Sequence, residues 1–577
     1  MKRLLLAALG LLSSLTAAVV EHGPIVHWSQ DPTQSTNIVW LERSGQGGVE
    51  GKWTTGPAGF GYGDNDDSTV FNRMHGNFIS VAIRRHIQLP PGVPGDAVLV
   101  LRVNYDDGFI AWLGGKEIAR KNITPDGSKA AGTHEAGQFD EFRLGRIDRL
   151  LTDKGTIIAL QGFNNALDSS DFTLHPILVA KHGQKEWPIS LANQPWEYLA
   201  NAKPEDGWQT RTTSPPGEPL AAAPAEYSLA WRIKNTGKWN TQNVASAPFA
   251  ASAHRVLRAT LTSLPAGKDI EFRIHHPGTT EISKTFSFRM PPEKAEPIRF
   301  VTGGDVYHSR EPMDKMNRVA GAQDPLFALI GGDLAYANNG SHDRWFDYID
   351  SWAQNARTPD GRLVPKIVAI GNHEIIGAGY HPTDAPGPEA ASMFYAIFSF
   401  PETNNATHTV DFGNWLSIVN LDSGHTKNIA AQNDWLEKTL KARAQVPNLF
   451  VCYHRPAWGV GAKPDAVDIQ KHWSPLFEKY RVTCVFENDH HTYSRSHPIK
   501  AGKIDEKDGI PYLGSGSWSV AVRPVDPKEI KNRPWIAHAE GRNHLYLIQT
   551  LPPGGYTAIA KDLDAKEFDR SLRDWKR

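Results

Sequence analysis

Five short polar clusters between residues 303 and 493 each follow an apolar run that predicts a β-strand. The clusters are Gly304-Asp305, Gly332-Asp333-Leu334-Ala335-Tyr336, Gly371-Asn372-His373-Glu374, Tyr453-His454 and Asn488-Asp489-His490-His491. Carboxylate, amide and imidazole groups are the ligands that hard and borderline metal ions prefer. Together, in this order and all at strand ends, the clusters predict a two-metal site that hydrolyses phosphate esters.

The chemistry of that hydrolysis explains why these residue types are needed. Water is a poor nucleophile at neutral pH, and a dianionic phosphate repels hydroxide. Two cations held close together acidify a bound water and neutralise the phosphate oxygens. Holding them so close requires a carboxylate that both share, with further anionic and imidazole ligands to offset their charge. A single Gly-Asp at a strand end is most often a turn. The prediction therefore depends on the occurrence of all five clusters in one segment.

The five clusters resemble the calcineurin-like metallophosphoesterases, and most closely the purple acid phosphatases, over about residues 293–550. The distinguishing element is Tyr336, three residues after Asp333, because that family uses such a tyrosinate as a ligand to Fe³⁺. The resemblance implies these ligands: Asp305, Tyr336 and His491 for the first metal, Asp333 as the bridge, Asn372 and His454 for the second metal. A metal-bound hydroxide would attack phosphorus in line.

Four residues are candidates for contacting the substrate or assisting its reaction. The resemblance implies that His373 contacts the phosphate or assists the leaving group, with Glu374 as its hydrogen-bonding partner. His308 follows the first cluster and is either a pocket residue or a structural or solvent-exposed histidine. His425 follows the predicted strand 416–421 and is either a substrate contact or a loop residue held by hydrogen bonds.

The last cluster departs from the family pattern of Gly-His-x-His. Alignment through the Tyr and Arg that follow places Asp489 where the second metal has a histidine, and His490 could instead turn in as the ligand. A carboxylate makes that position harder and more anionic, which favours Mn²⁺ or Fe²⁺ over Zn²⁺. We therefore predict a binuclear centre of Fe³⁺ with a divalent ion, one of Mn²⁺, Fe²⁺ or Zn²⁺.

The segment that must position these residues alternates buried-type strands with amphipathic helices. Strands are predicted at 298–302, 326–330, 366–370, 449–453 and 482–486, and helices at 313–322, 341–355, 431–444 and 472–480. This alternation predicts an α/β, layered metallophosphoesterase domain over residues 293–553. Residues 554–577 are charged and predict a terminal tail or surface helix.

The N-terminal half is predicted to be all-β, so the fold class is multidomain. Residues 19–45 and 225–292 resemble the two parts of a fibronectin type III-like sandwich. Residues 46–185 show short alternating strands with turn signals and resemble a jelly-roll module inserted between those parts. Residues 186–224 are rich in Pro, Gly, Ala and Thr, which is typical of a linker.

Composition narrows the possible partners and location. At 577 residues the chain is too long for a single hydrophobic core, so several domains are expected. Its net charge of −1 gives no electrostatic reason to expect nucleic acid or an anionic membrane as a binding partner. Residues 1–18 resemble a signal peptide, which predicts a secreted or periplasmic protein. No other apolar stretch reaches roughly 18 residues, so no membrane span is expected. Cys452 and Cys484 are more simply explained as two buried thiols than as a disulfide.

The sequence therefore predicts a secreted, acid phosphatase-like hydrolase of small phosphate monoesters. A phosphodiesterase or nucleotide hydrolase on the same metal core is an alternative, because the motifs do not separate the two. A third possibility is a glycan- or surface-binding protein that uses the jelly roll and whose phosphoesterase domain is inactive. The altered last cluster favours that possibility, whereas retention of the other ligand positions argues against it.

Overall fold

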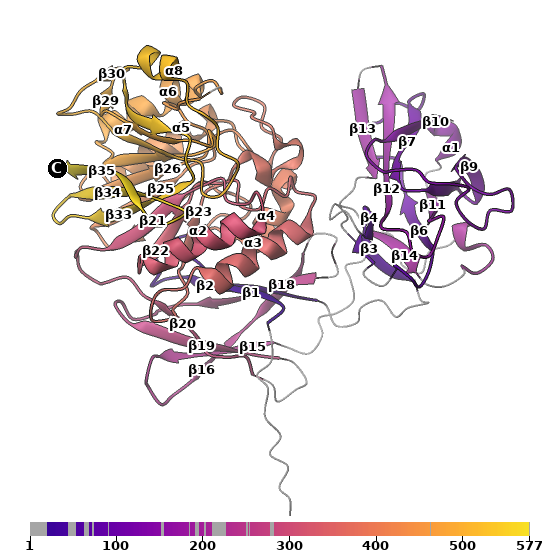
Figure 1. Ribbon diagram of the computed structural model, residues 1–577, viewed down its shortest axis with the longest axis horizontal. Helices are drawn as coiled ribbons and strands as arrows, with labels where there is room; N and C mark the ends of the chain where they lie inside the picture. Colours follow the sequence, from indigo (N-terminus) through magenta and orange to yellow (C-terminus); the bar gives the residue numbers. More distant parts are fainter. Residues whose placement is uncertain are drawn as a thin grey trace, which may run out of the picture.

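A computed structural model describes most of the chain in two lobes (Figure 1). The described residues are 20–43, 53–62, 69–71, 74–90, 92–151, 155–183, 185–190, 195–200, 204–210, 227–249, 252, 254–276, 282–461 and 463–575. The predicted signal peptide lies outside them. No helix in this part of the chain is both long and apolar enough to cross a membrane.

Two sheets form the centre of the larger lobe. The ten-stranded sheet has the order β17 (Ala245–Pro248), β18 (His254–Leu261), β2 (Thr36–Arg43), β1 (His22–His27), β23 (Lys366–Val368), β22 (Phe327–Ile330), β21 (Arg299–Gly303), β33 (His544–Thr550), β34 (Gly555–Asp562) and β35 (Glu567–Asp574). The seven-stranded sheet has the order β24 (His408–Phe412), β25 (Leu416–Asn420), β26 (Asn448–Cys452), β27 (Cys484–Glu487), β31 (Tyr512–Ser515), β28 (Tyr493–Ser496) and β32 (Ile536–Glu540).

The two sheets pack face to face through aromatic side chains. Phe300 on β21 lies 5.7 Å from Phe450 on β26 and 6.0 Å from Phe486 on β27, measured between ring centroids. Such edge-on pairs within a fully buried layer add to the stabilisation that comes from burying their surface. The packing brings the carboxyl ends of strands from both sheets to the same edge of the domain.

Helices cover the outer faces of these sheets and complete the layered domain (Figure 1). On the ten-stranded sheet lie α2 (Arg310–Ala322) and α3 (His342–Asn355), and on the seven-stranded sheet α5 (Asn433–Ala442), α6 (Val467–His472) and α7 (Ser474–Lys479). The remaining short elements are α4 (Ser392–Ile397), α8 (Pro527–Asn532), η2 (Asn372–Glu374), η3 (Ile376–Ala378), η4 (Pro388–Ala391), η5 (Ala430–Gln432), β29 (Ile499–Lys500) and β30 (Lys503–Ile504). The predicted α/β layered domain is thus confirmed.

A four-stranded sheet packs beneath one end of the ten-stranded sheet. Its order is β16 (Asn240–Asn243), β15 (Ser228–Ile233), β19 (Asp269–His275) and β20 (Phe286–Arg289). Trp28, which directly follows β1, and Trp40, on the neighbouring β2, share one buried core with Leu229 and Phe272 of this sheet. In addition, β2 pairs antiparallel with β18 along its whole length. These contacts support the proposal that residues 19–45 and 225–292 form one split, fibronectin-like sandwich.

The smaller lobe is a sandwich of two mainly antiparallel sheets that share a buried core (Figure 1). One sheet contains β10 (Asp140–Arg146), β7 (Val98–Tyr105), β12 (Phe172–His182), β4 (Phe60–Tyr62), β5 (Thr69–Val70) and β13 (Lys185–Ser190). The other contains β3 (Thr54–Pro57), β14 (Pro195–Ala200), β6 (Ser80–Ile87), β11 (Thr156–Phe163), β8 (Gly108–Leu113) and β9 (Lys116–Lys121). The short helices α1 (Ile147–Leu150) and η1 (Trp208–Thr210) flank it. The all-β N-terminal half is confirmed, and its jelly-roll character stays a prediction.

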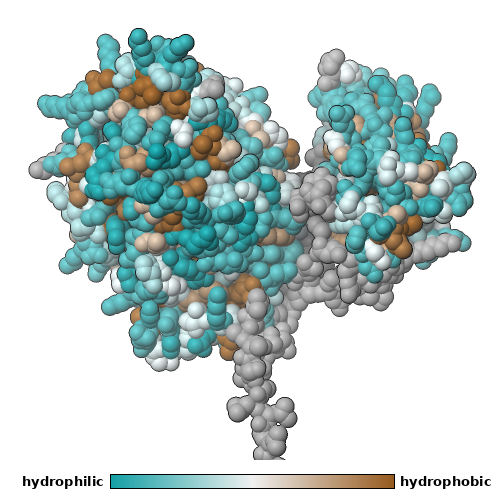
Figure 2. Space-filling model, viewed as in Figure 1, coloured by the Kyte–Doolittle hydropathy of each residue, from teal (hydrophilic) through white to brown (hydrophobic). Residues whose placement is uncertain are grey.

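Two segments differ from their predicted roles. The segment 554–577 is no tail or surface helix, because β34 and β35 form the last two strands of the ten-stranded sheet. The beginning of the predicted linker, in turn, belongs to the smaller lobe through β13 and β14, where Trp196 is buried in the core. Cys452 and Cys484 are buried free thiols on adjacent strands, as expected. Figure 2 shows that hydrophilic residues dominate one face of both lobes.

Candidate metal centre

The predicted ligands lie at the carboxyl ends of β21, β22, β23, β26 and β27, where the two sheets meet. Several of them have backbone conformations that residues other than glycine rarely adopt. Their φ angles are 56° for Asp305, 53° for Asp333, 52° for Tyr336, 65° for Asp489 and 54° for His491. Left-handed conformations cost free energy and cluster at functional sites. Their concentration here indicates that the chain is folded to aim these side chains inward.

Three donor atoms form a compact group at one side of the centre. The Tyr336 hydroxyl lies 3.0 Å from Asp305 Oδ1 and 3.0 Å from His491 Nε2, and these last two atoms are 3.1 Å apart. Neighbouring ligands with metal bonds of about 2.1 Å are separated by about 3.0–3.4 Å. His491 Nδ1 lies 3.2 Å from the carbonyl oxygen of Ala521, which assigns the ring proton to Nδ1 and leaves Nε2 as a donor to the centre. The geometry fits the ligand set predicted for the first metal.

The second group of donors surrounds His454 Nε2. Its Nδ1 lies 2.9 Å from the Gly331 carbonyl oxygen, so Nε2 faces Asp333 Oδ2 at 3.2 Å and Asn372 Oδ1 at 3.1 Å. The Asn372 amide is oriented by its Nδ2, which donates to the Ala378 carbonyl at 3.2 Å. Each side chain therefore turns its metal-binding atom toward the same point.

Asp489, and not His490, joins this second group. Asp489 Oδ1 lies 3.6 Å from His454 Nε2, whereas His490 turns its Nδ1 to the Val460 carbonyl at 2.9 Å. Asp489 also carries two ion pairs that the sequence did not predict. Arg455 Nη1 donates to its Oδ2 at 2.6 Å, and the Lys463 ammonium donates to its Oδ1. A buried carboxylate at the predicted position of the second metal is thus already paired with two cations.

The residues present fit a metal centre on the chemistry of their donors. One atom each from Asp305, Asp333, His454 and Asp489 lies within 4.8 Å of the others, and all four residues are buried. Within the described residues, Asp333 Oδ2 has no hydrogen bond of acceptable geometry, although it is fully buried. Burial raises the pKa of Asp333, but the electrostatic attraction of the neighbouring His454 outweighs burial and lowers the pKa to about 2. An ionised, buried oxygen without a hydrogen bond is a site for a cation.

Glu374 has a different role from the predicted one. His373 Nδ1 lies 2.7 Å from Asn338 Oδ1, so its partner is Asn338. Glu374 instead accepts three backbone N–H groups, from Asp333 at 2.8 Å, Leu334 at 2.7 Å and Gly371 at 2.7 Å. This correction follows from the tight turn of η2, which directs Glu374 back toward Gly371 and away from His373. Glu374 fixes the backbone that carries Asp333, the predicted bridging carboxylate.

The three candidate histidines occupy different environments. His373 is partly exposed, stacks on Tyr336 with 4.1 Å between ring centroids, and places Nε2 3.9 Å from Asp333 Oδ2. His308 is exposed, three residues beyond Asp305, and its role stays a prediction. His425 is fully buried beside His454, with 5.5 Å between centroids, and burial lowers its pKa to about 3. Its Nε2 meets Ser423 Oγ at 3.0 Å, which fits the loop-bonding alternative.

Asn488 replaces the glycine of the usual last motif and is accommodated by glycines in two neighbouring strand ends. A Cβ atom on Gly331 would come within 1.8 Å of Asn488 Nδ2, and one on Gly304 within 2.6 Å of its Oδ1. Asn488 Nδ2 donates to the Tyr453 carbonyl at 2.9 Å. The Asn488 side chain therefore packs against the strand end that carries Asp305 and is hydrogen-bonded to the strand end that carries His454.

Sequence comparison relates the part of the chain that carries this centre to a known domain family. Residues 298–492 match the family model of the calcineurin-like phosphoesterases. The chain contains a calcineurin-like phosphoesterase domain. The fold also resembles that of a purple acid phosphatase from yellow lupin seeds, with a TM-score of 0.51 at 15% identity, covering 85% of this chain and 92% of that one. The predicted resemblance to purple acid phosphatases is thereby confirmed.

Curated relatives of the phosphoesterase domain are distant. An uncharacterized protein of Mycobacterium tuberculosis is 28% identical over 306 residues, which cover 44% of this chain and 54% of that protein. Probable inactive purple acid phosphatase 27 of Arabidopsis thaliana is 26% identical over 306 residues, which cover 46% of this chain and 48% of that protein. The chain thus spans about half the length of these curated relatives.

The residues that sequence reasoning missed belong to loops. Lys463 and Asn338 follow no strand end and match no spacing rule, so no signal pointed to them. Arg455 directly follows His454, and this position indicates a residue that shapes the pocket, but its ion pair with Asp489 was not predicted.

Proposed function

We propose that this chain hydrolyses phosphate monoesters at a binuclear metal centre, outside the cytoplasm. The observation that carries the proposal is the convergence of Asp305, Tyr336 and His491 on one point and of Asp333, Asn372 and His454 on a neighbouring one. Cations at the two points would acidify a water molecule and neutralise the phosphate oxygens. Export is supported by the sequence of residues 1–18.

The donor atoms suggest which metals would bind. A phenolate together with a carboxylate forms a hard, anionic set that suits Fe³⁺, so we assign Fe³⁺ to the side with Tyr336. Asp489 makes the other side more anionic, which favours Mn²⁺ or Fe²⁺, with Zn²⁺ as the third candidate. If this assignment is right, Tyr336→Phe removes the visible absorption of the iron-loaded protein and leaves its unfolding transition unchanged.

The cations around Asp489 favour a monoester over a diester. An aspartate in place of a histidine subtracts positive charge from the centre, but Arg455 and Lys463 restore it. A phosphate monoester is a dianion near neutral pH and gains more from these two cations than a diester monoanion does. Lys463 is partly exposed, so its ammonium can also contact a phosphate oxygen.

His373 is the residue we assign to the leaving group. It lies at the rim of the centre, with about a quarter of its side chain exposed, and Asn338 fixes the orientation of its ring. Its Nε2 faces the space above Asp333, where a substrate oxygen would lie. Since Nδ1–H is bonded to the Asn338 oxygen, His373 in its protonated form can donate the proton on Nε2 to a departing alkoxide.

A second candidate function is an inactive phosphoesterase domain in a binding protein. The ion pairs of Arg455 and Lys463 engage both oxygens of Asp489, so a second metal ion has to compete with Lys463. One curated relative is itself named as probably inactive. The smaller lobe would then supply the function, for which a glycan is the proposed ligand.

Hydrolysis of p-nitrophenyl phosphate beside its bis ester, from acid to neutral pH, tests the proposal. The purified chain would be loaded with iron together with Mn²⁺ or Zn²⁺. Faster turnover of the monoester is the expected result. Faster turnover of the diester would change the function to phosphodiesterase. If the metal-loaded chain cleaves neither ester and Asp333→Asn behaves identically, the domain is inactive and the binding function replaces this proposal.

A further inference from the structure

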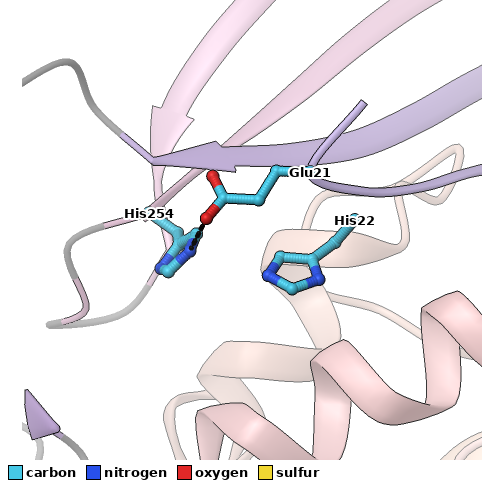
Figure 3. A group of neighbouring side chains, drawn as sticks. All are labelled: Glu21, His22 and His254. Atoms are coloured by element: carbon cyan, nitrogen blue, oxygen red, sulfur yellow. Dashed lines mark hydrogen bonds and ion pairs between the residues drawn. The ribbon is translucent and has the colours of Figure 1, made fainter. Parts of the chain in front are cut away.

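A second group of metal-binding side chains lies away from the phosphoesterase centre. Glu21 immediately precedes β1, His22 is its first residue, and His254 is the first residue of β18. One donor atom from each lies within 4.8 Å of the other two. Figure 3 shows the Glu21 carboxylate turned toward His254, with the His22 ring beside them, and Glu21 Oε1 is 3.3 Å from His254 Nε2.

The orientation of His22 is that of a metal ligand. Its Nδ1 lies 2.9 Å from Asp350 Oδ2 on α3, and Asp350 Oδ1 accepts the Gly23 N–H at 3.1 Å, so this carboxylate is held in place. The contact with Asp350 assigns the ring proton to Nδ1, which leaves a lone pair on Nε2. Metal-binding histidines characteristically donate their other N–H to a carboxylate in this way.

The aromatic ring of Phe346 forms an apolar wall beside the two imidazole rings. Phe346 stacks on His22 with 4.2 Å between centroids and 3° between planes, and it lies 4.4 Å from His254. The two imidazoles are themselves 5.4 Å apart. Two imidazole rings at this distance can direct one nitrogen each to a common cation.

A third histidine close to this group is buried without a partner. Among the described residues, neither ring nitrogen of His342 has a hydrogen bond. Burial, together with the charge that His254 can carry, lowers the pKa of His342 to about 3, so His342 is neutral. The surroundings therefore contain one more buried imidazole beside the group, although His342 is not one of its three donors.

We propose that Glu21, His22 and His254 bind a Zn²⁺ ion, with a solvent molecule as the fourth ligand. Two imidazole nitrogens and one carboxylate oxygen suit the tetrahedral geometry of zinc. The ion would join the start of β1 to β18 and, through Asp350, to α3. His254 pairs with Arg43, the last residue of β2, so the ion braces the sheet where the chain leaves it for the smaller lobe.

Counting bound Zn²⁺ in the full-length chain tests the site. The protein is equilibrated with Zn²⁺, freed of loose ions by gel filtration, and analysed by mass spectrometry for metal per chain. We expect the double variant E21Q/H254A to bind one ion fewer per chain than the natural protein. The control is His497→Ala, because His497 also bonds a carboxylate, Glu506 at 2.9 Å, but belongs to none of the donor groups found in the described residues.

Two further measurements keep the test decisive. Asp333→Asn, which alters the phosphoesterase centre, should leave the E21Q/H254A difference of one ion unchanged. If the double variant folds poorly, Asp350→Asn replaces it, and we expect about a tenfold or greater loss of Zn²⁺ affinity because such outer partners tune ligand strength by 10–100-fold. Equal zinc content in the natural protein and E21Q/H254A, or unchanged affinity in D350N, would overturn the proposal.

Discussion

Replacing Glu374 distinguishes a residue that positions the metal centre from one that takes part in the chemistry. Its carboxylate is 1% exposed and accepts N–H groups from Asp333, Leu334 and Gly371 at 2.7–2.8 Å. These three donors belong to the two loops that carry Asp333, the predicted bridging carboxylate, and Asn372. Removal of the side chain leaves three buried donors without an acceptor.

The expected cost follows from that count. Each unsatisfied buried donor costs about 1–3 kcal/mol, and removing a carboxylate buried beside Asp333 returns part of this, so we expect Glu374→Ala to lose about 3–5 kcal/mol. Glu374→Gln can still place its oxygen opposite the Asp333 and Gly371 donors and loses only the acceptor for Leu334. Its expected cost is about 1–2 kcal/mol.

Urea unfolding of the metal-free protein measures these free energies without a contribution from bound ions. Metal titration of the refolded variants is expected to show an affinity loss of about 10–100-fold for Glu374→Ala, because the ligand loops are no longer held. Glu197→Ala is the matched control, since it breaks a buried pair with Arg84 in the smaller lobe at 2.7 Å and should lower stability without changing metal affinity. If Glu374→Ala keeps its stability and metal affinity but loses turnover, Glu374 acts in the reaction and the positioning role is wrong.

Three other substitutions have definite expected results. Lys463→Met frees Asp489 and should raise Mn²⁺ affinity at the second site about tenfold or more, since hydrogen bonds to charged groups contribute about 1.5–3 kcal/mol; unchanged affinity in a competition titration contradicts this. Lys366 is fully buried without a hydrogen bond among the described residues, and burial lowers its pKa well below the usual value. Lys366→Met should therefore stabilise the protein at pH 7 by about 1–3 kcal/mol, with a gain that shrinks toward pH 10 as the unfolded lysine also loses its proton. Burial and neighbouring carboxylates raise the pKa of Asp106 to about 8, so the stability it contributes is complete below about pH 4 and is lost as the pH rises through 8. Between pH 5 and 8, the free energy of unfolding of Asp106→Asn should therefore fall by about 1–3 kcal/mol less than that of the natural protein, as measured by thermal unfolding. An equal fall in both proteins would contradict this prediction.

The strand ends of the centre could be predicted because the pattern there is local. Buried runs rich in branched and aromatic residues define β21, β22 and β26, and a polar residue shortly after each run is the predicted ligand. Parallel pairing of β21 with β22, and of β26 with β27, then brings these ends together within each sheet. What the sequence could not show is that the two sheets pack face to face, which joins the two sets of ligands into one centre.

The parts that could not be predicted depend on contacts distant in sequence. Residues 567–574 are mostly polar, a pattern that fits an exposed helix equally well, and only their place at the edge of the sheet allows such a composition in a strand. Glu374 is adjacent to His373 in sequence, which suggested a pair, but the turn of η2 separates the two side chains. The Lys463 loop contains neither periodicity nor a motif, so its contact with Asp489 depends wholly on the tertiary fold.

The charges around Asp489 argue that the centre can still bind metal with an aspartate in place of the family's histidine. A carboxylate substituted at random into a buried position would stand unpaired, at a cost of several kcal/mol, or would remain protonated. Here both oxygens are engaged, Oδ2 by Arg455 at 2.6 Å and Oδ1 by Lys463, and the backbone N–H of Asp489 donates to Asp305 Oδ2 at 2.8 Å. The substituted residue is thus bonded to the first-metal side as well. Because Asp489 is compensated on every side, Asp489→His should leave Arg455 and Lys463 as unbalanced cations and weaken binding of the second metal, whereas a damaged site would regain affinity from the same change.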